Sequence, residues 1–240
     1  MRKRLGTLEK GATTRKHKLF RLLSALVLAA VISAAGCGSP TGSSNQSTAQ
    51  GSAGGATAAA TPERTEVGET EVLVWGEGDY GVVMAHGAAY DAASWEDQAQ
   101  EIVRSGVVPL APEKASPENL LASAKYLREE RGVQDVAFVG ASAGGSAVLR
   151  AAEENPDAAD QLILLSATGD VTGLGDEPKL FVASEGEGIA EEVRRMAGEA
   201  PGEQNEVLIV PGDAHAQAVF GTKEGDELMQ ALLKRLEEHG

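Results

Sequence analysis

The stretch Val-Ala-Phe-Val-Gly-Ala-Ser-Ala-Gly-Gly at residues 136–145 decides the fold of this chain. Its first four residues are continuously apolar, which is typical of a strand buried on both faces. Three glycines then surround Ser142, and an Ala-rich run suited to a helix follows directly. The spacing Gly140-x-Ser142-x-Gly144 predicts a sharp strand-to-helix turn with the serine at its tip. The glycines are needed because side chains at their positions would collide with the neighbouring strand and helix.

On both sides of this turn, short apolar runs alternate with helical patterns. Strands are predicted at residues 71–75, 81–85, 107–110, 136–139, 162–165, 180–183 and 207–210. Helices are predicted at residues 93–105, 117–131, 143–154, 189–197 and 224–238. This order predicts an α/β domain with a mostly parallel sheet of about seven strands, flanked by helices and without a cap domain. The segment Gly76-Glu77-Gly78-Asp79 predicts a hairpin turn that pairs the first two strands antiparallel.

A serine in such a turn needs a base to act as a nucleophile, and the chain has four histidines. His17 lies in the basic amino-terminal stretch, and His239 lies at the charged end of the last predicted helix. His215 lies in the loop that leaves the last predicted strand. Loops at the carboxyl ends of parallel strands converge on one site, so His215 is the predicted general base. His86 follows the second predicted strand.

The chain resembles the α/β-hydrolases in three places across residues 70–240. These are the His86-Gly87 turn, the turn around Ser142 and the terminal loop with His215. The resemblance is to small, capless members related to dienelactone hydrolases and simple esterases. It implies an α/β-hydrolase fold and an oxyanion hole made by the backbone amides of Ala88 and Ala143. It also implies that His86 is a structural residue of its turn, not the base.

The acid that orients the base is expected in the loop after residues 180–183, which reads Ser184-Glu185-Gly186-Glu187. Related hydrolases commonly carry Gly-x-x-Asp here, so Glu187 is the predicted acid. The order Ser142, Glu187, His215 is the one expected of the α/β-hydrolases. Three alternatives stay open, namely Asp170, Glu185 and Asp213.

The amino-terminal residues have the pattern that is typical of an export signal. Residues 1–36 hold eight of the chain's 21 basic residues and a single acid, and the apolar run at residues 22–35 is shorter than the roughly 20 residues of a spanning helix. Ser33-Ala34-Ala35-Gly36-Cys37 resembles the lipobox of bacterial lipoproteins, which implies cleavage before Cys37 and acylation of its sulfur. Residues 37–66 are rich in Ser, Gly, Ala and Thr, which predicts a flexible tether. Residues 67–240 are predicted to form the folded domain.

Composition narrows the function further. A formal net charge of −15 argues against nucleic-acid binding, which depends on Lys and Arg meeting phosphate. One cysteine excludes an internal disulfide framework. No motif for a nucleotide or a metal is present, so no cofactor is expected. The expected function is an exported, lipid-anchored serine hydrolase that cleaves small esters. The replacement of Asp by Glu leaves open a non-catalytic binding or interaction module.

Overall fold

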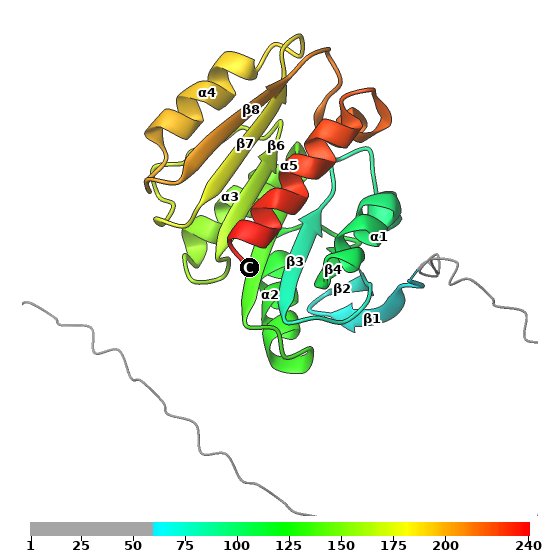
Figure 1. Ribbon diagram of the computed structural model, residues 1–240. Coiled ribbons are helices and arrows are strands. Elements are labelled where there is room, and N and C mark those ends of the chain that lie inside the picture. Colours follow the sequence, from blue (N-terminus) through cyan, green and yellow to red (C-terminus); the bar gives the residue numbers. More distant parts are fainter. Residues whose placement is uncertain (1–59) are drawn as a thin grey trace, which may run out of the picture. The chain divides into compact units, whose positions relative to one another are not determined.

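The structure is a computed structural model, which describes residues 60–240 (Figure 1). In this part of the chain the strands are β1 (Glu63–Val67), β2 (Thr70–Val74), β3 (Tyr80–Ala85), β4 (Val107–Pro112), β5 (Asp135–Ala141), β6 (Gln161–Leu165), β7 (Lys179–Ser184) and β8 (Asn205–Val210). The α-helices are α1 (Glu96–Arg104), α2 (Pro117–Glu130), α3 (Ala143–Glu154), α4 (Ala190–Glu199) and α5 (Gly225–Glu238). Two 3-10 helices are η1 (Ala92–Trp95) and η2 (Ala216–Gly221). All seven predicted strands and all five predicted helices are present.

The eight strands form one sheet in the order β1-β2-β4-β3-β5-β6-β7-β8. Strands β3 to β8 are parallel, whereas β1 pairs antiparallel with β2 and β2 antiparallel with β4. The expected mostly parallel sheet is confirmed, with one strand more than the seven predicted.

The predicted hairpin between the first two strands is wrong. β2 and β3 do run in opposite directions, but β4 lies between them and pairs with both. All six residues of β4 are buried, so this strand takes an inner position of the sheet, with a partner on each side. The segment from Gly76, which has φ +66°, therefore crosses to a position beyond β4 instead of turning back.

Strand β1 begins at Glu63, four residues before the start of the folded domain that the sequence predicts at residue 67. Four of its five residues are polar and only Val67 is buried, so no apolar pattern marks it. Pairing with β2 holds it at the sheet edge, where Arg64 forms a 2.6 Å ion pair with Glu71. The rest of the predicted tether, Cys37 and the predicted signal peptide lie outside the described residues.

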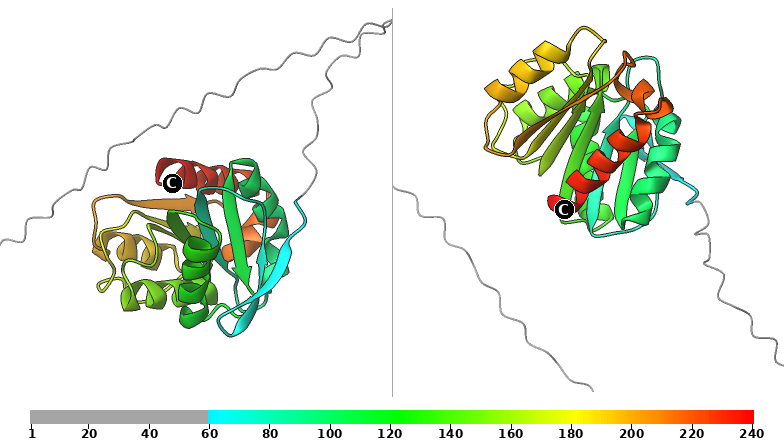
Figure 2. Two further views of the ribbon diagram at one scale, coloured as in Figure 1. Left: turned by 90° about the horizontal axis from the view of Figure 1, so that it is seen from below. Right: turned by 45° about the horizontal axis from the view of Figure 1, so that its top comes forward.

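Two apolar layers cover the sheet, one on each face. Side chains alternate along β5: Val136 and Phe138 enter one layer, and Ala137 and Val139 enter the other. The first layer packs against α2, α3 and α4, and the second against α1 and α5. Figure 2 shows the sheet between these two groups of helices. Helices on both faces explain why the parallel strands are apolar along their whole length.

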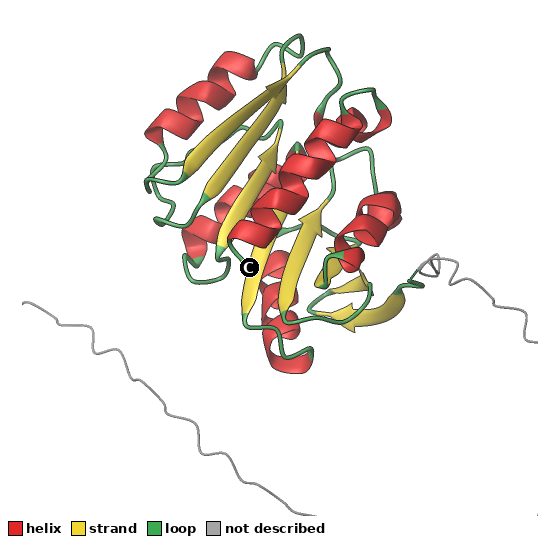
Figure 3. Cartoon of the chain, viewed as in Figure 1, coloured by secondary structure: helices red, strands yellow, loops and turns green. Residues whose placement is uncertain are grey.

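The carboxyl ends of the parallel strands all lie on the same side of the sheet (Figure 3). The loops that carry His86, Ser142, Glu187 and His215 leave β3, β5, β7 and β8 on this side. Side chains that are far apart in the sequence are therefore brought together there. Within residues 60–240, no helix is both long enough and apolar enough to cross a membrane.

Candidate active site

Ser142 lies at the tip of a strained turn between β5 and α3. Its φ of 51° and ψ of −115° are rare for a residue with a side chain. The turn is held by the Ser142 amide, which donates to the Leu165 carbonyl oxygen at 2.8 Å. A Cβ atom on Gly144 would collide with the carbonyl oxygens of Ala85 and His86, and one on Gly145 with the Ala167 side chain. Close packing between strand and helix thus requires the glycines that the sequence places around the serine.

His215 connects Ser142 to Glu187. Its Nε2 atom lies 2.8 Å from Ser142 Oγ, and its Nδ1 atom lies 2.6 Å from Glu187 Oε2. With the proton on Nδ1, the imidazole donates to the carboxylate and accepts from the serine hydroxyl. The side chain of His215 is 53% exposed and that of Glu187 only 3%. The histidine therefore faces an open site, while the acid behind it is shielded from water.

Glu187 is held by donors that leave one oxygen for the histidine. Oε1 accepts from the Ser166 hydroxyl at 2.8 Å and from the Ser184 amide at 2.5 Å. Oε2 is then directed at His215. Because both oxygens of the buried carboxylate have partners, the position of the acid is fixed before any substrate binds.

The three alternative acids lie elsewhere. The Asp170 carboxylate accepts from the amide and hydroxyl of Thr172, at 2.9 and 2.7 Å, and these bonds lower the pKa of Asp170. Glu185 and Asp213 are exposed. Within residues 60–240, Glu187 is the carboxylate in hydrogen-bond contact with His215. The structure thus brings the predicted Ser142, His215 and Glu187 into one chain of contacts.

The two amides assigned to the oxyanion hole are next to the serine. Ala143 is the first residue of α3, where the partial positive charge of the helix dipole is greatest. Ala88 follows Gly87, and a Cβ atom on Gly87 would lie 3.7 Å from Ser142 Cβ. Both alanines are exposed, and neither amide has a hydrogen-bond partner in the described part of the chain. Two donors adjoining the serine are therefore free to bind an oxygen atom.

The ring nitrogens of His86 are hydrogen-bonded to neither Ser142 nor Glu187. Its Nδ1 and Nε2 atoms lie 2.9 Å from the Gly87 carbonyl oxygen and 3.1 Å from that of Glu113. It joins the loop after β3 to the end of β4, as a structural residue of the turn would.

Sequence reasoning missed two polar residues that support the site. Ser166 follows β6 directly and links Glu187 to the amide of Ala216, which donates to Ser166 Oγ at 2.9 Å. Gln217 lies two residues after the predicted base and contacts the loop after β3. Each is a single polar side chain beside an apolar run, which is the signal that could have identified it.

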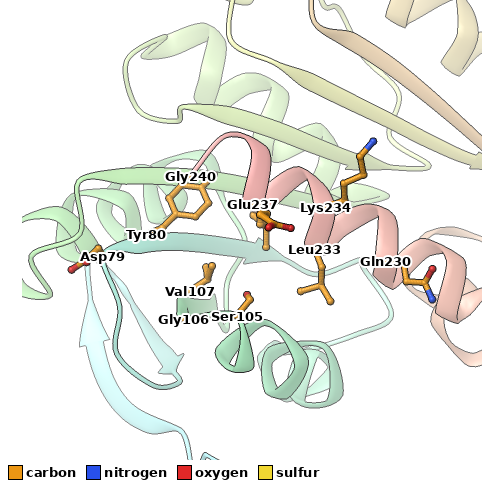
Figure 4. A pocket seen from close by; sticks show the side chains of 11 residues that line it. Asp79, Tyr80, Ser105, Gly106, Val107, Gln230, Leu233, Lys234, Glu237 and Gly240 are labelled. Carbon is orange, nitrogen blue, oxygen red and sulfur yellow. The ribbon is translucent and has the colours of Figure 1, made fainter.

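A pocket lies at the opposite end of the sheet from Ser142, between the end of α5 and the start of β4 (Figure 4). It encloses about 730 Å³, and Tyr80, Val107 and Leu233 form part of its wall. No histidine is among its 11 lining residues. It therefore holds no serine–histidine pair. In residues 60–240, no group of three or more His, Cys, Asp or Glu side chains is placed to hold a metal ion.

No family model matches the sequence, and no curated protein does. Solved structures do match the fold. Monoacylglycerol lipase from Paleococcus ferrophilus is 16% identical, with a TM-score of 0.61 over 72% of this chain and 100% of that one. Dienelactone hydrolase from Anabaena variabilis is 17% identical, with a TM-score of 0.57 over 75% and 97% of the two chains.

A thermostable carboxylesterase cloned from a metagenomic library is 14% identical, with a TM-score of 0.63 over 76% of this chain and 89% of that one. All three identities are too low to carry a function across, whereas the TM-scores of 0.57 to 0.63 show that the fold is shared over most of each chain. The chain therefore has the α/β-hydrolase fold.

Proposed function

We propose that the chain is a serine hydrolase that cleaves carboxylic esters through an acyl-enzyme at Ser142. One observation carries this proposal, the chain of contacts from Glu187 through His215 to Ser142, with distances of 2.6 and 2.8 Å. A nucleophile, a base and a group that orients the base are what acyl transfer needs, and these three are in hydrogen-bond contact without a substrate.

The reaction follows from these contacts. Ser142 Oγ attacks the ester carbonyl carbon while His215 Nε2 takes the hydroxyl proton. The amides of Ala88 and Ala143 stabilise the negative oxygen of the tetrahedral intermediate. When the intermediate collapses, His215 returns the proton to the leaving alcohol. Water, activated by the same histidine, then releases the acid from Ser142, and Glu187 stabilises the imidazolium in both halves.

Esters of small alcohols or short acyl chains are the proposed substrates. The half-exposed His215 side chain and the absence of any helix or strand between β6 and β7 in the described residues leave the serine open to solvent. An open site buries little of a long chain, so it gains little free energy from one. Solved enzymes with this fold include a carboxylesterase and a monoacylglycerol lipase, which supports ester chemistry over other acyl transfer.

A fluorophosphonate probe tests the proposal on the full chain. The probe should label Ser142, as mapped by mass spectrometry, and labelling should be lost in Ser142→Ala and fall steeply in His215→Ala. Ser146→Ala is the matched control, because Ser146 lies one turn further along α3 and donates to the Thr168 carbonyl oxygen. Folded protein without labelling at Ser142 would refute the serine hydrolase and leave the non-catalytic alternative.

The proposal extends to where the enzyme acts. Cleavage before Cys37 and acylation of its sulfur would anchor the domain to the outer face of the cell membrane, because each buried methylene adds about 0.8 kcal/mol of membrane affinity. Cys37→Ser should release the protein from the membrane fraction with ester hydrolysis unchanged. Intact mass measurement of the mature protein separates an acylated Cys37 from an ordinary cleaved signal.

A further inference from the structure

We propose that Gln217 is a positioning residue, which sets the orientation of the oxyanion loop at residues 86–94. This inference rests on the proposed ester hydrolase function. Gln217 is 7% exposed, and its side chain joins two points of that loop. Oε1 accepts from the Gly87 amide at 2.8 Å, and Nε2 donates to Ser94 Oγ at 3.0 Å. One planar amide thus fixes both ends of the segment that carries Ala88.

The bond at Gly87 determines which amide remains for the substrate. Residues 87–90 form a turn closed by the Tyr90 amide, which donates to the Gly87 carbonyl oxygen at 3.0 Å. In a turn closed in this way the amide of the second residue, here Ala88, is not used by the closing bond. Gln217 occupies the Gly87 amide, so Ala88 supplies the free donor. Rotation of the turn about Gly87 would redirect the Ala88 N–H bond away from the serine.

The same short segment also positions the base. Gln217 belongs to η2, which begins directly after His215, and the Ala216 amide is held by Ser166 Oγ at 2.9 Å. Ser166 in turn donates to Glu187. A continuous series of hydrogen bonds therefore runs from the acid through η2 to the oxyanion loop. We therefore expect η2 to hold His215 and the Ala88 amide in a fixed position relative to each other.

A second contact makes the same connection without hydrogen bonds. Trp95, at the end of η1, packs edge-on against Phe220 of η2, with ring centroids 6.1 Å apart and planes at 73°. Trp95 is fully buried. This contact holds η1 near η2 but does not involve the turn at Gly87. Among the described residues, Gln217 is the partner of the Gly87 amide, while His86 Nδ1 lies 2.9 Å from the carbonyl oxygen of the same residue.

The test compares an ester with the matching thionoester, in which sulfur replaces the carbonyl oxygen. Amide donors placed for an oxyanion stabilise the larger, weakly accepting sulfur poorly, so the ester-to-thionoester ratio of kcat measures the oxyanion hole. In Gln217→Leu, kcat for the ester should fall about 10- to 100-fold, as a misplacement near 1 Å predicts, with KM within about threefold. The rate ratio should fall by a similar factor, and the pH profile of kcat/KM should not move.

Gln161→Leu is the matched control. Gln161, like Gln217, is a buried amide with two partners, but it lies at the start of β6, where it donates to the Tyr80 hydroxyl and to the Arg235 carbonyl oxygen. This variant should lose stability while its ester-to-thionoester ratio stays that of the wild type. Gln217→Glu keeps an oxygen for the Gly87 amide, so it should recover most of the ratio that Gln217→Leu loses.

The outcomes separate the two proposals. A wild type that hydrolyses no ester refutes the proposed function, whereas an active wild type whose ratio is unchanged in Gln217→Leu overturns the role of Gln217. If Gln217→Leu does not fold, Ser94→Ala tests the role of Gln217 instead, since it removes only the hydrogen bond from Gln217 Nε2 to Ser94 Oγ. A ratio lowered about threefold or more in Ser94→Ala supports the inference, and an unchanged ratio overturns it.

Discussion

Replacing Glu187 by Gln tests the orientation of the base with almost no change in side-chain shape. One carboxylate oxygen becomes an NH₂ group, and the surroundings decide which one. Oε1 accepts from the Ser166 hydroxyl and the Ser184 amide, at 2.8 and 2.5 Å. An NH₂ group there would face the Ser184 donor, so the new amide must place its oxygen at this position and its nitrogen towards His215 Nδ1.

This orientation gives the imidazole the wrong tautomer. With a donor opposite, Nδ1 must accept, so the proton moves to Nε2, which can no longer take the hydroxyl proton of Ser142. Loss of the correct tautomer in such a triad costs about 10⁴-fold in kcat, which corresponds to about 5 kcal/mol of transition-state stabilisation. The fold should survive, because the new amide keeps the bonds to Ser166 and Ser184.

The assay is steady-state hydrolysis of a p-nitrophenyl ester of a short acid, with the labelling rate of Ser142 by a fluorophosphonate measured in parallel. Glu185→Gln is the matched control, because Glu185 is an exposed neighbour in the same loop. It should retain the wild-type kcat. A Glu187→Gln variant that folds and loses less than about tenfold in kcat would refute the assignment of Glu187 as the orienting acid.

Three further changes address the supports of the site. Ser166→Ala should lower kcat about tenfold and the free energy of unfolding by about 1–3 kcal/mol, because it takes a hydrogen-bond partner from the buried Glu187 carboxylate and from the Ala216 amide. Kinetics and urea unfolding that show equal losses in Ser146→Ala would contradict this prediction. Gly144→Ala should lower the free energy of unfolding by about 1–3 kcal/mol, since its Cβ would meet main-chain oxygens, whereas Gly198→Ala, which has open space in α4, should raise it by roughly 0.5 kcal/mol. A higher urea midpoint for Gly144→Ala than for Gly198→Ala would refute the packing argument. Burial lowers the pKa of Lys179, so between that lowered value and the ordinary one the unfolded chain binds more protons and stability rises with pH. The unfolding free energy of the wild type minus that of Lys179→Met should therefore grow towards about pH 10, and a constant difference would count against it.

The fold could be predicted from the sequence because its signals are local. Apolar runs without alternation indicate parallel strands buried on both faces, and glycines around Ser142 indicate the turn. These patterns placed seven strands and five helices correctly. They missed β1, whose single buried residue is Val67, because an edge strand is held mainly by backbone bonds that any residue makes. They misplaced β3 because loop length does not reveal which strand becomes the neighbour.

For the candidate site, too, some residues could be predicted from the sequence and others only from the tertiary structure. The sequence by itself predicted Ser142 as the nucleophile and His215 as the base, because the turn pattern and the order of the strands can be read from adjacent residues, and the resemblance to the α/β-hydrolases implied the amides of Ala88 and Ala143. The sequence favoured Glu187 but left three other acids open, and only the tertiary structure shows that Glu187 contacts His215, because this contact depends on how the loops after β7 and β8 approach each other. The tertiary structure also revealed the bridges of Ser166 and Gln217, which join residues up to 130 positions apart. Such bonds leave no local pattern, because they form only where the sheet brings distant loops to one edge.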